Sequence, residues 1–498
     1  MNRVTSDFRG SESLSSESGP RQGQMRDWLA FALVLAGGLV VGAAVVLDLL
    51  VRFLPQEIGG ETKDRLVWLM GLLSVPIALV IMFTRHRCSA GGVPRTPSWL
   101  IVGALSILAV SVVTLTEVPG IPTDLQTSWW LGFGPNVFIC SVVAGFALAF
   151  FKVRNGFIVS RVVWTLGLLV GLVWVLPSFI NLPWTYDVFH APQVLNDTLA
   201  LYAGRFPLSD YIPQYSVVLG WPVAIMFPLI DGFLGPQHLT VVLSLFLSLL
   251  GLASAGIAVY VGFRLLPKGS KALAPLLVLP LFVHVSGSVS ATPARLLLPL
   301  VAFALLLGIS DQAGKSRFFS LGVVLGLCLL NNPEIGAVTA VSAVGGLVVS
   351  GIKGRLPHLL YLGIGTAAPV FAYSAYGYFT GNPIDLSQIA AYARAFSGGY
   401  YSLPMPTFGT YVLILMVGAG ATVLGVVASK FVVRKEDRVA AVGAVFAGLF
   451  VLGSFAYYVG RSSSSGQLQF LLPFTALSIV ALVGLVGIPS FLQRKAES

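Results

Sequence analysis

Apolar runs of close to 20 residues, separated by short polar stretches, recur along most of this chain. An α-helix needs about 20 apolar residues to cross the hydrocarbon core of a bilayer. The pattern therefore predicts an all-α, polytopic membrane protein with about 14 transmembrane helices. The expected spans are 28–53, 65–84, 98–117, 129–151, 160–182, 238–263, 272–288, 294–310, 317–332, 334–351, 357–379, 408–428, 438–459 and 468–488.

The segment 216–235 is the ambiguous one, because it is apolar but is interrupted by Pro222 and Pro228 and carries Asp231. Cytoplasmic loops of membrane proteins are enriched in Lys and Arg, and this rule decides the matter. If 216–235 does not cross, only three of the later basic residues lie outside: Arg295, Arg394 and Arg461. We infer that the segment is re-entrant or lies at the outer interface, and that both termini are cytoplasmic.

Composition agrees with this class, since 56% of the 498 residues are hydrophobic and only 10% are charged. The net charge of +10 is explained by cytoplasmic helix anchors and needs no nucleic acid. Three scattered cysteines, Cys88, Cys140 and Cys328, show no metal-ligand spacing. A soluble core, a disulfide framework and a structural metal site are therefore not indicated.

Four regions follow from the pattern of apolar runs. Residues 1–26 are polar and are expected to form a disordered cytoplasmic tail. The next expected regions are an amino-terminal four-helix membrane module at 27–155, a transmembrane core at 156–490 and a cytoplasmic tail at 491–498.

Polar residues on the expected outer face gather in a few places. The densest is Trp184–Tyr215, which collects acids, His, Arg and Tyr within an otherwise apolar chain. The candidate site residues are Asp187, His190, Asp210, Tyr215, Arg295, Asn332, Glu334 and Arg461. Arginines supply forked donors for a phosphate, and a carboxylate can take a proton from a hydroxyl. Without a Walker or Rossmann motif, an exported lipid phosphate is the more natural donor than a nucleotide.

The order of these residues resembles the GT-C superfamily of integral-membrane glycosyltransferases. The likeness lies in Asp187-Val-Phe-His190 after the first core helix, in Gly204-Arg205-Phe-Pro207-Leu-Ser-Asp210-Tyr211, and in Pro213-Gln-Tyr215. Asn332-Pro-Glu334-Ile-Gly336 and Tyr458-Val-Gly460-Arg461-Ser462 add to it. The motifs are short, and the resemblance covers roughly residues 160–488.

This resemblance implies inverting transfer of a monosaccharide from a polyprenyl-phosphate donor to a glycan, glycolipid or protein acceptor of the cell envelope. Asp187 would be the catalytic base, and Arg461 and Arg295 would face the donor phosphate. No cofactor is expected, and a metal is not indicated because Asp187 lacks an adjacent acid. The expected location is a bacterial plasma membrane, with the site facing the periplasm or exterior. The sugar and the acceptor stay open.

Each candidate also has an ordinary structural interpretation. Asp187 could cap a helix, and Asp210 could be a turn residue in PLSDY. Pro333 and Glu334 fit the first turn of a helix, and Arg461 could reach lipid headgroups. Two other functions also stay open: a secondary transporter, and a lipid-linked polysaccharide ligase or polymerase. The former usually places ionisable residues near the bilayer midplane, and the latter has a large outer loop late in the chain.

Overall fold

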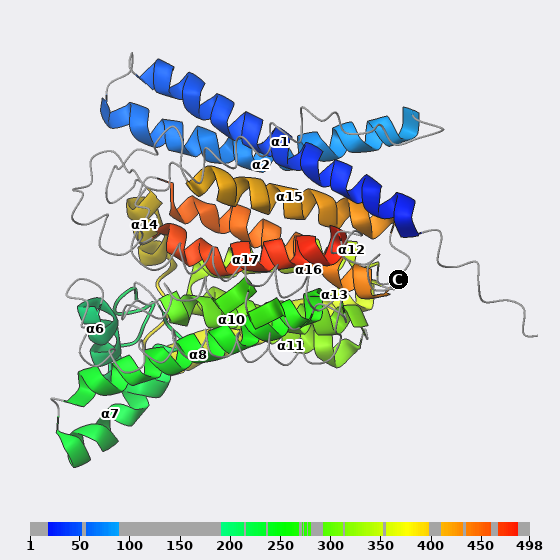
Figure 1. The fold of residues 1–498 in the computed structure, drawn as a ribbon. Helices are drawn as coiled ribbons and strands as arrows, with labels where there is room; N and C mark the ends of the chain where they lie inside the picture. Colours follow the sequence, from blue (N-terminus) through cyan, green and yellow to red (C-terminus); the bar gives the residue numbers. More distant parts are fainter. Residues whose placement is uncertain are drawn as a thin grey trace, which may run out of the picture.

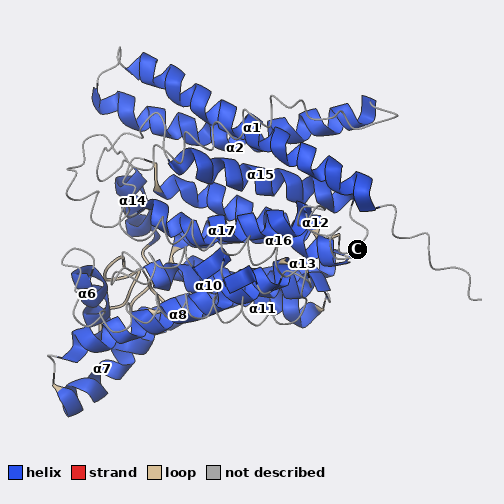
Figure 2. Cartoon of the chain, in the orientation of Figure 1, coloured by secondary structure: helices blue, strands red, loops and turns tan. Residues whose placement is uncertain are grey.

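The computed structural model shows an almost entirely helical protein (Figures 1 and 2). It describes residues 18–51, 56–88, 191–213, 216–235, 238–267, 271, 273–275, 277–279, 292–311, 314–351, 355–397, 410–431, 435–459 and 467–486. Within these ranges the one β-type pairing is an isolated bridge between Pro207 and Tyr211. The expected all-α membrane class is thereby confirmed for the described part of the chain.

The helices have the following bounds: α1 Ser18–Val51, α2 Gln56–Cys88, α6 Ala191–Tyr202, α7 Gly220–Leu234, α8 Leu239–Leu265, α10 Thr292–Asp311, α11 Lys315–Asn331, α12 Pro333–Val349, α13 Arg355–Phe379, α14 Leu386–Ser397, α15 Thr410–Phe431, α16 Lys435–Ser454, the 3₁₀ turn η4 Phe455–Tyr457, and α17 Gln467–Val486.

Six described helices are long and apolar enough to cross a membrane: α1, α2, α8, α13, α15 and α16. Shorter apolar helices occur in α7, α10, α12 and α17. The expected spans in the described ranges coincide with helices to within a few residues at most ends. The expected spans 98–117, 129–151 and 160–182 lie outside the described residues, as does much of 272–288. The total of 14 and the orientation of the bundle stay predictions.

The bundle is layered around α15, α16 and α17 (Figure 1). The α1–α2 pair packs on α15 from one side, and α8, α10, α11, α12 and α13 lie on the other. Stacked rings fill the interior between α10, α16 and α17. The centroids of Phe450 and Phe474 are 3.7 Å apart, and those of Phe303 and Phe446 are 4.4 Å apart. Burying such rings contributes a large share of packing energy.

Glycines let α11 and α13 approach closely. A Cβ added at Gly322 would collide with the Leu362 carbonyl oxygen, and one added at Gly326 would collide with that of Thr366. Gly365 on α13 faces the Phe319 carbonyl oxygen in the same way. Small residues at helix contacts are typical of membrane proteins, where close backbone packing replaces the hydrophobic effect.

Three short helices occur where the sequence indicated only polar loops or an ambiguous segment: α6, α7 and α14. In addition, α1 begins at Ser18, within the segment 1–26 expected to be a disordered tail. A membrane helix can continue beyond the bilayer with polar side chains, because its backbone hydrogen bonds are made within the helix. A hydropathy pattern does not detect such an extension.

The ambiguous segment 216–235 contains α7, a helix of 15 residues with Pro228 inside it. Val223 and Phe227 on one face form a cluster with Leu239 and Leu243 of α8, so α7 runs back along the first turns of the next helix. At about 1.5 Å per residue, α7 is shorter than the roughly 30 Å hydrocarbon core. This is the length and packing we expect of an interfacial or re-entrant segment.

The bundle has two distinct ends in Figure 1. The helices α6, α7 and α14 lie together at the end opposite the carboxyl terminus. The α11–α12 turn and the starts of α8 and α10 belong to the same end, which is called the site end below.

Candidate functional site

Asn331, the last residue of α11, joins three separate parts of the chain at the site end. Its side-chain Oδ1 accepts hydrogen bonds from the Ser216 hydroxyl at 2.5 Å and from the Val218 N–H at 3.2 Å. Its Nδ2 donates to the Ala294 carbonyl at 2.9 Å. Only 4% of Asn331 is exposed, so these bonds satisfy an amide that would otherwise be buried without partners.

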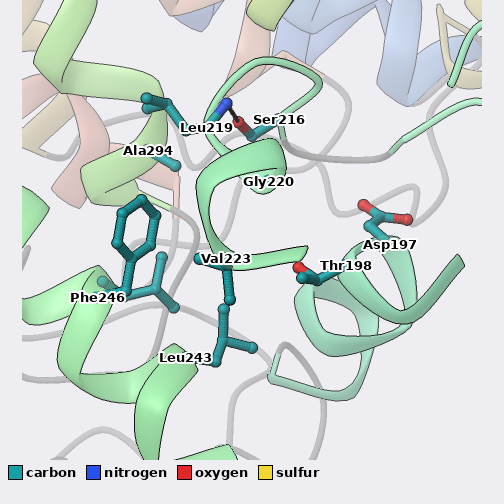
Figure 3. Close-up of a pocket in the computed structure, with 10 residues that line it drawn as sticks. Asp197, Thr198, Ser216, Leu219, Gly220, Val223, Leu243, Phe246 and Ala294 are labelled. Atoms are coloured by element: carbon teal, nitrogen blue, oxygen red, sulfur yellow. Dashed lines mark hydrogen bonds between the residues drawn. The ribbon is translucent and has the colours of Figure 1, made fainter. Parts of the chain in front are cut away.

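The backbone reinforces the same junction. The Val217 N–H donates to the Asn331 carbonyl at 3.1 Å. The Leu219 N–H reaches the Ser216 hydroxyl oxygen at 3.1 Å, at the entry to α7 (Figure 3). Asn331 therefore fixes where the segment after the Pro207–Tyr211 turn enters the bundle.

Asn332 and Glu334, both candidate site residues, begin the next helix. The Asn332 side-chain Oδ1 accepts from the Ile335 N–H at 3.1 Å, which makes Asn332 the N-cap of α12. Glu334 is exposed in the first turn, where an acid is favoured by the helix dipole. The turn is tight, because a Cβ at Gly336 would lie 2.5 Å from the Leu329 backbone. Both residues thus have the structural roles that Asn-Pro-Glu suggests, and Glu334 is exposed at the start of α12.

Arg295 follows Ala294 at the start of α10 and is 9% exposed. Its Nη1 donates to the Tyr457 hydroxyl at 2.9 Å, and its guanidinium carbon lies 4.9 Å from the Tyr457 ring centroid. This combines a charge-assisted hydrogen bond with a cation–π contact. Tyr457 lies in η4, four residues before Arg461 in the sequence.

Asp210 stabilises the turn that contains the Gly-Arg-Phe-Pro motif. Its Oδ2 accepts from the Phe206 N–H at 2.6 Å, and its own N–H donates to the Phe206 carbonyl at 2.9 Å. Within this turn Leu208 has a φ of 68°, a left-handed conformation that is unfavourable for a branched side chain. Asp210 is exposed, so it can face a ligand while it holds the turn.

The turn is docked on α13 and on the loop before α14. The Tyr373 hydroxyl donates to the Pro207 carbonyl at 3.0 Å, and the Asp385 N–H donates to the Leu208 carbonyl at 2.9 Å. The strained conformation of Leu208 thus persists because contacts on both sides determine it.

The Phe206 ring inserts among other aromatic rings. Its centroid lies 5.0 Å from that of Tyr373, 5.8 Å from that of Tyr376 and 6.0 Å from that of Trp221. Phe206 is buried, and a Cβ at Gly377 would lie 3.0 Å from its ring. These rings attach the turn to the bundle.

Two loop groups have shifted ionisation. The Tyr211 hydroxyl donates to the Asp197 carbonyl at 2.9 Å, and burial, followed by the charge of Asp197, raises the pKa of Tyr211 above its usual value. Hydrogen bonds from the Ser387 hydroxyl and then from the Gln388 N–H lower the pKa of the exposed Asp385 carboxyl. Tyr211 therefore stays a neutral donor and Asp385 a charged acceptor at neutral pH.

A small cavity adjoins the Asn331 junction between α6, α7, α8 and α10 (Figure 3). Asp197, Thr198 and Ser216 supply its polar edge, and Val223 and Phe246 are among its apolar lining. Its volume is about 20 Å³. Since a water molecule needs about 10–15 Å³ of such volume, the cavity accommodates water but not a sugar ring.

Half of the candidate site residues fall within the described ranges. The structure brings Arg295, Asn332 and Glu334 to the site end around Asn331, and it places Asp210 in the docked turn nearby. Asp187, His190, Tyr215 and Arg461 lie outside the described residues. Among the described residues no group of three or more His, Cys, Asp or Glu side chains could hold a metal ion.

Two features were not identified from sequence. Asn331 and Asn332 look alike there, yet the former makes the bridge and the latter is a cap. Lys63 and Asp64 of α2 were not among the candidate site residues, yet only 5% and 1% of their surfaces are exposed. The one sequence feature that could have indicated this burial is the acid between two bases in Lys-Asp-Arg at 63–65.

Comparisons with protein-family models, with curated proteins and with solved structures found no match to this chain.

Proposed function

We propose that this protein is a GT-C-type membrane glycosyltransferase. It would transfer a monosaccharide from a polyprenyl-phosphate donor to a glycan, glycolipid or protein of the cell envelope, on the outer face of a bacterial plasma membrane. Asp187 would act as base, and Arg295 and Arg461 would bind the donor phosphate. His190, Asp210, Tyr215, Asn332 and Glu334 would contribute to substrate binding.

The observation that carries this proposal is the Asn331 junction. Its hydrogen bonds join the segment after the Asp210 turn to the start of α10, which carries Arg295. The next residue, Asn332, caps α12, which carries Glu334 in its first turn. These parts of the sequence have no local reason to meet. Their convergence at one end of an apolar bundle supports a site there, because polar groups are otherwise scarce in this chain.

In the proposed reaction Asp187 accepts the proton of an acceptor hydroxyl. The hydroxyl oxygen then forms a bond to the anomeric carbon from the face opposite the leaving group, and the bond between that carbon and the phosphate oxygen breaks. The electron pair goes to polyprenyl phosphate, whose charge the arginine guanidiniums neutralise. The products are an inverted glycoside and polyprenyl phosphate.

The charge distribution supports an end-facing site over ion-coupled transport. Carriers place ionisable residues near the bilayer midplane. In the described α8, α15 and α16, by contrast, every Asp, Glu, Lys and Arg lies within about one turn of a helix end. The described α17 carries none of these residues.

The proposal is tested by reconstituting the purified protein in liposomes with radiolabelled polyprenyl-phosphate monosaccharides and membrane glycans as acceptors. We expect transfer from one donor, and a loss of at least about 10²-fold in Asp187→Asn, because a positioned base contributes about 10²–10⁴-fold. The control is Asp231→Asn, which removes an exposed carboxylate of α7 at the same end. The proposal fails if no donor supports transfer, or if Asp187→Asn and Asp231→Asn are equally active.

A further inference from the structure

Two adjacent charged residues, Lys63 and Asp64, are buried at the beginning of the apolar part of α2. Asp64 is 1% exposed and Lys63 is 5% exposed. The apolar span of this helix begins at Lys63, so both groups lie where the chain enters the expected membrane region. Charged side chains are seldom buried this completely, and in a membrane helix they usually mark a function.

Asp64 belongs to the face of α2 that packs into the bundle. Residues four and seven positions later, Trp68 and Gly71, share this face. The Trp68 indole N–H donates to the Leu452 carbonyl of α16 at 2.8 Å. A Cβ at Gly71 would lie 3.2 Å from the Leu415 side chain of α15. Asp64 therefore lies on the face of α2 that packs against α15 and α16, where only 1% of its surface is exposed.

These contacts show where Asp64 lies along the length of the bundle. Asp64 lies one helical turn before Trp68, toward the site end. On α16, one turn beyond Leu452 in the same direction is η4, and α2 packs directly against η4. Tyr457 of η4 holds the Arg295 guanidinium through its hydroxyl and its ring. Thus η4 connects α2 with Arg295.

We propose that Asp64, together with Lys63, is a positioning residue of the site, which fixes η4 and through Tyr457 orients Arg295 toward an anionic phosphate. The helix pair α1–α2 would then contribute to the geometry of the site end. The catalytic consequence rests on the glycosyltransferase function proposed above, whereas the fixing of η4 does not.

The first test measures η4 without using activity. A single Cys is introduced by Ala456→Cys in a background with Cys88, Cys140 and Cys328 replaced, and its labelling rate with a maleimide is followed in detergent. Asp64→Asn should raise this rate about tenfold, because the proposed hold of the buried carboxylate on η4 is weakened. Asp64→Glu should restore a rate near that of wild type, and Asp231→Asn should leave the rate unchanged.

The second test separates donor binding from chemistry. In the liposome assay, Asp64→Asn should raise the KM for the polyprenyl-phosphate donor about tenfold, with a smaller change in kcat, because Arg295 would be held less well in ground and transition states alike. Asp64→Glu should recover most of the affinity. Asp231→Asn again serves as the exposed control.

The outcomes of the two tests are distinguishable. Faster labelling without any sugar transfer by the wild type would support the positioning role and reject the glycosyltransferase. Normal labelling and an unchanged KM in a folded Asp64→Asn protein would overturn the inference and leave the glycosyltransferase intact. If Asp64→Asn aggregates, Lys63→Gln with the same two readouts replaces it, and wild-type values there would also overturn the inference.

Discussion

Asn331 is the residue on which the geometry of the site end depends most. In Asn331→Leu, similar in volume, the Val218 N–H and the Ala294 carbonyl lose their partner. Each buried polar group left without a partner costs about 1–3 kcal/mol. We therefore expect Asn331→Leu to lower the free energy of unfolding by about 2–5 kcal/mol, measured in mixed micelles of mild detergent and SDS. Asn332→Ala, which removes only the α12 cap, should cost about 1 kcal/mol. Equal losses in the two variants would contradict this assignment.

Tyr211 should make the free energy of unfolding depend on pH in the alkaline range. Its pKa is raised in the folded protein, so unfolding releases its proton once the pH exceeds about 10, the unfolded value. The contribution of Tyr211 to the free energy of unfolding is thus complete below about pH 10, and it is lost as the pH rises toward the raised pKa of Tyr211 in the folded protein. At pH 7, Tyr211→Phe should be about 1 kcal/mol less stable, because the hydrogen bond to Asp197 is missing. The difference should shrink between pH 10 and 11, and a constant difference would refute the explanation.

The sequence predicted which segments contribute to the site end better than it predicted which side chain plays which role there. Asn331 and Asn332 are adjacent, but one ends a helix facing Ser216 and the other caps the next helix. Only the packing of distant segments decides between them. Asp64 illustrates the same limit, because its burial follows from the contact of α2 with α16 and not from the residues beside it.

At the scale of elements, the α11–α13 contact depends on glycine. A methyl group at Gly326 would meet the Thr366 carbonyl and the Pro369 ring, both backbone-anchored and unable to move away. Gly326→Ala should therefore destabilise the protein by about 1–3 kcal/mol in mixed-micelle unfolding. Gly363→Ala is the control in the same helix pair, since no atom lies within 4 Å of its added Cβ. It should be neutral or slightly stabilising because alanine favours helix, and an equal loss there would argue against the close contact.

The helix α14 depends on Asp385, whose carboxylate accepts from the N–H groups of Ser387 and Gln388. Asp385→Ala should speed amide hydrogen exchange in the first turn of α14, because these groups lose their partner. Asp385→Ser, which retains an acceptor, should exchange more slowly than Asp385→Ala. Unchanged exchange in Asp385→Ala would show that α14 is held by other contacts.

Most long helices could be predicted from hydropathy because their apolar runs match the membrane thickness. The NNPE turn also predicted the junction of α11 and α12 at Asn332. The short helices α6, α7 and α14 could not be predicted in this way. Their 12 to 15 residues are too few for a spanning signal, and their stability comes from tertiary contacts such as Val223 with α8.

At the scale of the whole molecule, the two ends of the bundle should face opposite sides of the membrane. Ser316 lies at the start of α11 and Leu386 at the start of α14, three helices later, and both are exposed. In a Cys-free background, Leu386→Cys should react with an impermeant thiol reagent added to intact cells, and Ser316→Cys should react only after permeabilisation. The reverse result would mean that 216–235 crosses the membrane after all.

The single-residue link at Asn332 also constrains how the protein is made. The helices α11 and α12 each have 17 residues, or about 25 Å, which is less than the hydrocarbon thickness of about 30 Å. Because no loop connects them, α11 cannot insert fully into the bilayer before α12 is also available. We expect the insertion machinery to release them together as a helical hairpin, so that Glu334 crosses the membrane at the tip of the pair during synthesis. A photo-crosslinker placed in α11 of a ribosome-bound chain should accordingly still reach the insertion machinery when α11 alone has emerged from the ribosome, and should lose that crosslink once α12 has emerged as well.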